Sequence, residues 1–305
     1  MKKDIDFPQW ILFCVAGISA LFIFIIIGFI LLTAAPVLEK EGIGFFLTSN
    51  WDYSTNQYGI FIFLTDTIIL TLLTLLIAVP FGILTAIYLA EWAPPWTAGI
   101  MRPLVELLVG IPSVVYGLFG LIILSNYFID YLYPFTNTVL GFIPLFNNVH
   151  PQIHQGLFLT AIILAIMVIP TIVALSQDAM KGVQDEYREA SFALGATKWE
   201  TIRHVVIPAA FPGIITAIVL AMMRAIGETM AVVVLMGNSP MIPRSLFDEG
   251  YPMTAKILND ILYYMPEPEP RSALFAIAVV IFLFEIAAVA GVRLICSFIQ
   301  KGSGS

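Results

Sequence analysis

Charged residues are scarce in this chain. Asp, Glu, Lys and Arg make up 11% of its 305 residues, whereas hydrophobic residues make up 59%. Soluble domains carry about 25% charged residues, so a soluble fold could not bury this much apolar surface. The net charge of −7 also argues against nucleic-acid binding, which needs a basic face. The composition therefore predicts an all-α, polytopic membrane protein that lies in a lipid bilayer.

The residues that a disulfide framework, a metal site, ATP binding or catalysis would need are also scarce or absent. Two cysteines in apolar segments and three scattered histidines predict neither a disulfide framework nor a metal site. The chain has no Gly-x-x-x-x-Gly-Lys-Ser/Thr loop, so any ATP and Mg²⁺ would be bound by another chain and no cofactor is expected here. It also shows no nucleophile–base pair that would indicate a membrane enzyme.

Long apolar runs predict six membrane-spanning helices, since about 20 residues cross a bilayer. The expected spans are 10–32, 59–90, 103–127, 156–176, 208–236 and 272–296. Aqueous loops are expected at 33–58, 128–155 and 237–271. The predicted organisation is an N-terminal helix with its outer loop (1–58), a core of five spans (59–300), and a linker remnant (301–305).

The distribution of Lys and Arg predicts the orientation of these spans. With six spans, both termini lie on one side together with the polar segment 178–207. That side carries nine basic residues and the other side four. The nine are Lys2, Lys3, Arg102, Lys181, Arg188, Lys198, Arg203, Arg293 and Lys301, and the four are Lys40, Arg244, Lys256 and Arg271. The excess places the termini and segment 178–207 in the cytoplasm.

Segment 178–207, called the hairpin segment below, predicts two short helices. The first runs from Asp185 to about Leu194 and ends at Gly195, which suits a left-handed backbone. Thr197 and Glu200 have the spacing of a capping box that starts the second. Pro208 stands where the fifth span could begin. An ordinary connecting hairpin and a partner-binding element are both compatible with this pattern.

The hairpin segment resembles the EAA loop of ABC-importer permeases. The pattern reads Glu189-Ala190-Ser191, then Gly195 after three residues, and Val205-Val206-Ile207-Pro208 after nine more. Ser191 departs from the family alanine by a small-for-small change. The resemblance implies a coupling helix that docks on a cytoplasmic ATPase. The residues it would use are Glu189, Ala190, Ser191, Gly195, Ala196 and Thr197.

Three further stretches are similar to phosphate permeases of the PstC type. They are residues 193–199 (ALGATKW), 224–229 (RAIGET) and 110–117 (GIPSVVYG). The resemblance covers nearly the whole chain and implies a type I ABC-importer permease fold in a bacterial plasma membrane. It also implies a second related permease, two ATPase subunits and an extracytoplasmic phosphate-binding protein as partners.

The expected fifth span contains Arg224 and Glu228, four residues apart and thus on one helix face. A charge at that depth costs about 2.5–3.5 kcal/mol on insertion scales, so both must face the bundle interior, a partner or water. In one interpretation the two neutralise each other as a structural pair. In the other, Arg224 binds a passing anion with its planar donor fork, and Glu228 orients it or accepts a proton of the cargo. Thr229 adds a hydroxyl to the same surface.

Alternatives remain open from the sequence. The EAA loop does not separate phosphate from sulfate, molybdate or phosphonate, although RAIGET and GIPSVVYG favour phosphate. A proton-coupled secondary transporter would use Glu228 and Glu285 as carriers. Such transporters often contain paired halves with broken helices, and this chain shows no convincing internal repeat.

Overall fold

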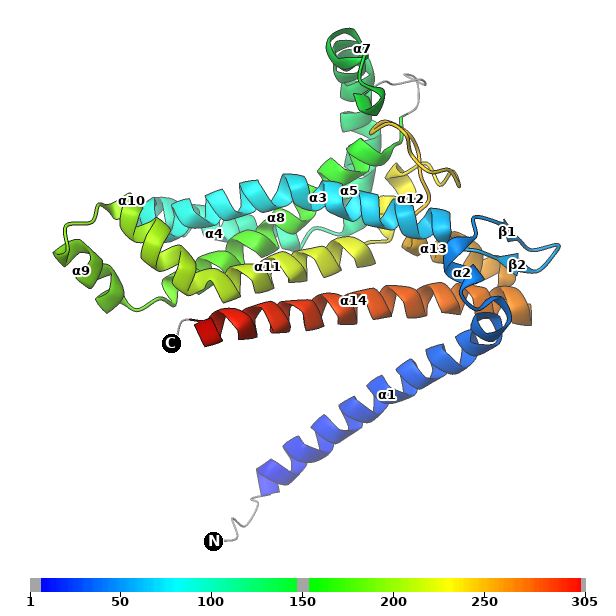
Figure 1. Cartoon of the computed structure of the whole chain (residues 1–305), viewed down its shortest axis with the longest axis horizontal. Helices are drawn as coiled ribbons and strands as arrows, with labels where there is room; N and C mark the ends of the chain where they lie inside the picture. Colours follow the sequence, from blue (N-terminus) through cyan, green and yellow to red (C-terminus); the bar gives the residue numbers. More distant parts are fainter. Residues whose placement is uncertain (1–6, 147–153, 303–305) are drawn as a thin grey trace. The chain divides into compact units, whose positions relative to one another are not determined.

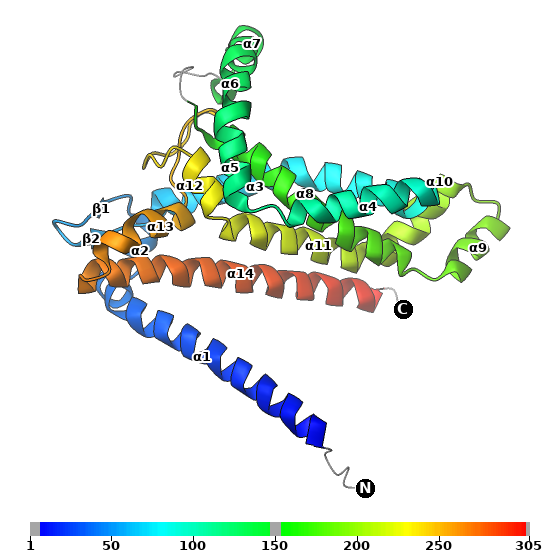
Figure 2. The ribbon, with the colours of Figure 1, turned by 180° about the vertical axis from the view of Figure 1, so that it is seen from behind.

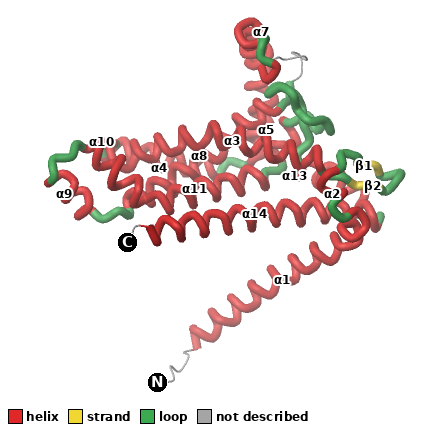
Figure 3. Tube along the Cα trace, in the orientation of Figure 1, coloured by secondary structure: helices red, strands yellow, loops and turns green. Residues whose placement is uncertain are grey.

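The computed structural model describes residues 7–146 and 154–302 and is almost entirely helical (Figure 1; Figure 3). Six helices of the described part are long and apolar enough to cross a membrane, as the sequence predicted. They are Trp10–Glu41, Phe61–Trp92, Ser113–Leu140, Leu157–Lys181, Lys198–Gly227 and Pro268–Leu294. The helices fall into two compact units, which are described separately.

The first unit joins the described residues up to Phe61 with Asp260–Phe282. It contains α1 (Phe7–Glu41), α2 (Gly44–Leu47) and a small hairpin of β1 (Trp51–Asp52) and β2 (Gln57–Tyr58). The helix α1 passes through Pro36 and extends nine residues beyond the predicted end at Leu32, to Glu41. Near this proline, Ser272 Oγ accepts the Val37 N–H at 3.1 Å and donates to the Ala34 carbonyl at 3.3 Å. These bonds satisfy backbone groups beside a residue that would otherwise weaken the helix.

The second unit comprises Ile62–Asn259 and the chain from Leu283 onward. Its elements are α3 (Phe61–Ile87), α4 (Pro95–Val109), α5 (Ser113–Phe119), α6 (Ser125–Tyr127), α7 (Tyr133–Leu140), α8 (Leu157–Lys181), α9 (Asp185–Ala193), α10 (Lys198–Thr201), α11 (Ile207–Gly227), α12 (Met230–Leu235), α13 (Met253–Tyr264) and the later part of α14 (Pro268–Gly302). The helix α8 is the most buried of the spans and packs along α11 and α4. A continuous apolar surface on α8 explains its central place.

The third predicted span, 103–127, is wrong in its bounds. The helix α4 already ends at Val109, and a new helix starts at Ser113, directly after Pro112. Proline has a backbone angle suited to a helix start but no N–H to continue the preceding helix. The new helix runs through π-helical turns to Leu140, and Figure 2 shows α5, α6 and α7 as one rod. Phe128 and Tyr133, which were assigned to an aqueous loop, are buried in a core cluster of this unit.

Two other segments between predicted spans also contain helices. Residues 91–102, which lie between the second and third predicted spans, hold the first half of α4, and the predicted loop 237–271 holds α13. In α13 the residues from Met253 to Lys256 are buried, so tertiary packing rather than a long apolar run stabilises it. The predicted boundary at residue 59 and the linker at 301–305 stay predictions, and residues 303–305 lie outside the described part.

Candidate functional site

The fifth span is interrupted where the sequence predicted one continuous helix over 208–236. The helix α11 ends at Gly227, Glu228 has an extended backbone with ψ 126°, and α12 starts at Met230. Glycine and β-branched threonine are poor helix formers, so the chain breaks easily around Glu228 and Thr229. At its other end the span begins at Lys198, ten residues before Pro208, through a π-helical turn. Arg224 therefore lies in the last turn of α11 and not midway along the span.

The interruption separates Arg224 from Glu228. The two form no ion pair, and within the described residues the Arg224 guanidinium has neither an ion-pair partner nor a hydrogen bond. Glu228 Oε1 instead accepts the Ala231 N–H of α12 at 3.3 Å, and Thr229 Oγ1 donates to the Gly227 carbonyl at 3.1 Å. Arg224 is half-buried. A half-buried cation without a protein partner can bind an anion, whereas a neutralised pair could not.

A second interruption lies beside the first. The helices α4 and α5 are separated by Gly110-Ile111-Pro112, and Tyr116 Oη bridges this gap by donating to the Leu108 carbonyl at 3.0 Å. The helices α5 and α12 approach closely because Gly117 has no side chain: a β-carbon there would lie 3.2 Å from the Ala231 Cα. The second interruption is thus next to α12, and Arg224 lies in the last turn of α11 before the first one.

Two residues that the sequence did not place at this site also reach the interruption. Thr254 of α13 donates from Oγ1 to the Glu228 carbonyl at 2.9 Å. Glu285 of α14 lies near Gly227, where an added β-carbon would be 3.8 Å from its Oε1. The sequence singles out Glu285 only as a proton carrier in the alternative of a secondary transporter, and Thr254 lies in a segment that it predicts to be a loop.

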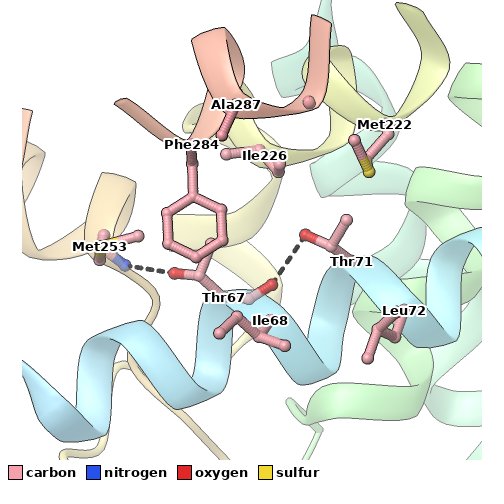
Figure 4. A pocket seen from close by; sticks show the side chains of 10 residues that line it. Thr67, Ile68, Thr71, Leu72, Met222, Ile226, Met253, Phe284 and Ala287 are labelled. Carbon is pink, nitrogen blue, oxygen red and sulfur yellow. Dashed lines mark hydrogen bonds between the residues drawn. The ribbon is translucent and has the colours of Figure 1, made fainter. Parts of the chain in front are cut away.

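A cavity of about 300 Å³ lies among α3, α11, α13 and α14 (Figure 4). Its lining is apolar apart from two threonines, and no charged residue contributes to it. The Thr67 and Thr71 hydroxyls both donate to main-chain carbonyls four residues earlier at 2.7 Å. Such a cavity offers an anion no binding group, so Arg224 and not the cavity defines the candidate site.

The hairpin segment has the predicted local structure. The helix α9 ends before Gly195, whose φ is +88°, and Thr197 with Glu200 forms the predicted capping box at the start of α10. Ser191, the departure from the EAA pattern, hydrogen-bonds Thr201 across the two helices at 2.9 Å. Glu189 and Ala190 are exposed, and Leu194 is 90% exposed. The segment thus offers a partly apolar surface that the described residues leave uncovered.

Arg188 fixes this segment to the rest of the unit, a role that the sequence did not reveal. Its guanidinium pairs with Glu91 at 3.1 Å and with Asp185 at 3.1 Å, and donates to the Met180 carbonyl at 2.9 Å. The Trp92 and Trp199 rings stack nearby with centroids 5.7 Å apart. Arg188, which directly precedes the EAA motif, therefore links the hairpin segment to the end of the second span.

Comparison with known proteins identifies the family. The family model described as "Binding-protein-dependent transport system inner membrane component" matches residues 78–299. The chain belongs to this family. The predicted resemblance to ABC-importer permeases is thereby confirmed, and the chain is a multi-pass membrane protein.

Several permeases are similar over much of their length. The chain is 41% identical over 215 residues to "Probable ABC transporter permease protein YqgH" of Bacillus subtilis, and the alignment covers 70% of this chain but only 64% of that protein. It is 34% identical over 270 residues to "Phosphate transport system permease protein PstC" of Xylella fastidiosa, covering 88% of this chain and 83% of the relative. The protein of the same name from Haemophilus influenzae is 32% identical over 295 residues, with 94% and 93% covered.

Solved structures confirm the predicted permease fold. The chain is similar to a chain of a bacterial alginate ABC transporter in complex with an alginate-bound periplasmic protein, with a TM-score of 0.60, 15% identity, and 94% and 96% of the two chains covered. A chain of the inward-facing MetNI methionine ABC transporter gives a TM-score of 0.50 at 18% identity, covering 75% and 92%. In the described part of this chain, no three His, Cys, Asp or Glu residues gather as metal ligands.

Proposed function

We propose that this chain is the membrane-spanning permease subunit of an ATP-driven phosphate importer in a bacterial plasma membrane. Relatives named phosphate transport system permease proteins are 32–34% identical to it over most of their length. The observation that carries the proposal within this chain is Arg224, a half-buried arginine without a protein partner in the described residues, one turn before a break in a membrane helix.

The chemistry around Arg224 suits a partly protonated oxyanion. The guanidinium presents parallel donors that match two phosphate oxygens, and Thr229 lies at the adjoining break with its hydroxyl. Glu228 and Glu285 add carboxylates near the same place, which would repel a fully deprotonated anion but accept a hydrogen bond from a protonated one. One arginine gives weak binding, as release on the far side requires. Strong selection of the cargo would then belong to an extracytoplasmic binding protein.

Coupling to ATP would use the hairpin segment. Its EAA-type residues, Glu189 to Ser191 and Gly195 to Thr197, are exposed or partly exposed and would dock on a cytoplasmic ATPase subunit. Both termini would then lie in the cytoplasm. The working transporter would contain this chain, a second related permease and two ATPase subunits that bind ATP and Mg²⁺. This chain itself would hydrolyse nothing, and it would alternate between inward- and outward-open states as its partners close.

Phosphate uptake into vesicles that contain the whole complex tests the proposal. Arg224→Gln removes the charge and the parallel N–H donors of the guanidinium. Uptake should therefore fall roughly 10- to 100-fold, as expected for the loss of charged hydrogen bonds. Arg224→Lys keeps the charge but not the parallel donors, so its phosphate uptake should lie between those of the wild type and Arg224→Gln. Arg293→Gln is the matched control, because Arg293 is exposed near the end of α14 and should transport like the wild type.

Assembly and ATP hydrolysis are recorded with every variant. If Arg224→Gln transports phosphate normally, Arg224 does not handle cargo. If the wild type moves sulfate or molybdate in preference to phosphate, the substrate assignment is wrong while the permease assignment stands. If uptake needs a proton gradient and not ATP, the chain is a secondary transporter instead.

A further inference from the structure

Thr254 replaces a helix hydrogen bond that the interrupted span has lost. In a continuous helix the Glu228 carbonyl would accept the N–H of Val232, four residues later. Here Glu228 is extended, and its carbonyl accepts Thr254 Oγ1 from α13 at 2.9 Å. Thr254 is only 7% exposed, so a carbonyl without this donor would be poorly compensated by water. The hydroxyl therefore favours the interrupted backbone over the continuous helix.

The first turn of α13 is itself fixed against α3. The Met253 N–H donates to Thr67 Oγ1 at 3.0 Å, as Figure 4 shows, and the Tyr251 N–H donates to Asp66 Oδ2 at 2.6 Å. Thr67 is 5% exposed and Asp66 is fully buried. Because both bonds are made within three residues before Thr254, they fix the backbone that carries its hydroxyl toward the Glu228 carbonyl.

The donor that the Glu228 carbonyl accepts, Thr254 or a helix N–H, decides where the Glu228 carboxylate lies. In the interrupted form Oε1 accepts the Ala231 N–H at 3.3 Å and so caps α12. In a continuous helix Arg224 and Glu228 would be four residues apart on one face, where opposite charges pair. The paired form would occupy the guanidinium that the proposed function assigns to the anion.

We propose that Thr254 is a positioning residue for anion transport. By holding the Glu228 carbonyl outside the helix, it keeps the Glu228 carboxylate on α12 and leaves Arg224 available to the anion. This inference rests on the proposed function for its transport consequence. Its structural part, that Thr254 maintains the interruption, does not depend on which substrate is carried.

The test uses the assembled transporter in vesicles with Thr254→Val, which keeps the shape and removes the hydroxyl, and Thr254→Ser, which restores it. Thr74→Val is the matched control, because Thr74 is fully buried in α3 and its hydroxyl has no partner within the described residues. Amide hydrogen exchange of residues 229–233 is measured without substrate, and phosphate uptake is measured over a range of concentrations. Thr254→Ala replaces the valine variant if the latter does not assemble.

For Thr254→Val we expect slower exchange at Val232, as the continuous helix forms, and about tenfold lower uptake at low phosphate, which corresponds to roughly 1.4 kcal/mol. Thr254→Ser and Thr74→Val should resemble the wild type. A second expectation is specific to the mechanism. In a Glu228→Gln background, Thr254→Val should cause little further loss of uptake, because no carboxylate remains to neutralise Arg224.

Unchanged exchange and uptake in Thr254→Val would overturn the proposal. So would a serine variant as impaired as the valine variant, since packing and not the hydroxyl would then matter. Equal losses from Thr254→Val with and without Glu228→Gln would refute the competition for Arg224. If the wild type takes up no phosphate, the proposed function fails, and the exchange measurement still decides whether Thr254 maintains the interruption.

Discussion

Replacing Arg188 by glutamine should release the hairpin segment from the unit that carries it. The Arg188 guanidinium pairs with Glu91 and Asp185, both at 3.1 Å, and donates to the Met180 and Val183 carbonyls. The Arg188 and Glu91 side chains are only 15% and 9% exposed. Glutamine reaches less far and carries no charge, so two carbonyls and two carboxylates lose their donor together.

The size of the effect follows from this burial. Exposed ion pairs contribute about 0–1 kcal/mol, whereas removing one partner of a buried pair costs about 3–5 kcal/mol. Because Arg188 is partly exposed, we expect a cost of about 3 kcal/mol for Arg188→Gln. Glu91→Gln should cost about 1 kcal/mol, since Arg188 keeps its other acceptors. A coupling energy of about 1 kcal/mol between the two substitutions is expected in a double-mutant cycle.

Amide hydrogen exchange of residues 183–197 measures this local opening in the assembled complex. A loss of about 3 kcal/mol should speed exchange through the opened state by roughly 100-fold. Arg102→Gln is the control, because the Arg102 pairs with Glu106 and Asp178 are about half exposed and should contribute little. If the hairpin segment is the ATPase contact that we propose, uptake per ATP hydrolysed should also fall in Arg188→Gln.

Exchange that stays unchanged in Arg188→Gln would refute this reasoning. The stacked Trp92 and Trp199 rings would then be sufficient to hold the hairpin segment. A coupling energy near zero between Arg188→Gln and Glu91→Gln would show that the main-chain acceptors of Arg188, and not the ion pair, supply the stability.

Three further outcomes are expected. Hydrogen bonds from Ser54 and Thr55 lower the pKa of Asp52 below 3.8. Asp52 therefore stabilises the β1–β2 turn above pH 3.8, and this stabilisation is lost as the pH falls through the lowered pKa. In Asp52→Asn, amide exchange of the turn should no longer show this acid dependence. Gly195→Ala should destabilise the hairpin segment by about 1–2 kcal/mol, because its φ is +88°, measured by the same exchange. Thr197→Ala should cost about 1 kcal/mol there by removing a cap, and Thr197→Ser should restore it.

Local sequence signals predicted the hairpin segment well. Gly195 has the left-handed backbone, and Thr197 and Glu200 form the capping box, because both features depend on residues within one turn of each other. The six spans were predicted for a similar reason, since length and hydropathy alone define them. Pro112 is the local signal for the start of α5 at Ser113, but the apolar run around it hides this signal.

The interior of the site could not be predicted in this way. Thr254 donates to a carbonyl 26 residues earlier in the chain, and Tyr116 bridges a gap between two helices that the sequence merged into one. In the sequence Arg188 counts only as one of the basic residues of the cytoplasmic side, although it pairs with Glu91, 97 residues earlier. These interactions depend on which helices become neighbours, and helical periodicity carries no information about that.

The same physics explains why the error at Glu228 falls on the candidate site. An interrupted helix inside a membrane exposes carbonyls that lipid cannot satisfy, so other parts of the protein must supply the donors. Thr254 donates to the Glu228 carbonyl. The Ala231 N–H donates to the Glu228 carboxylate, which therefore does not pair with Arg224. In a continuous helix these two charges share one face, and the sequence leaves open whether they pair or whether Arg224 binds an anion. The interruption favours the second interpretation, because within the described residues Arg224 and Glu228 form no ion pair.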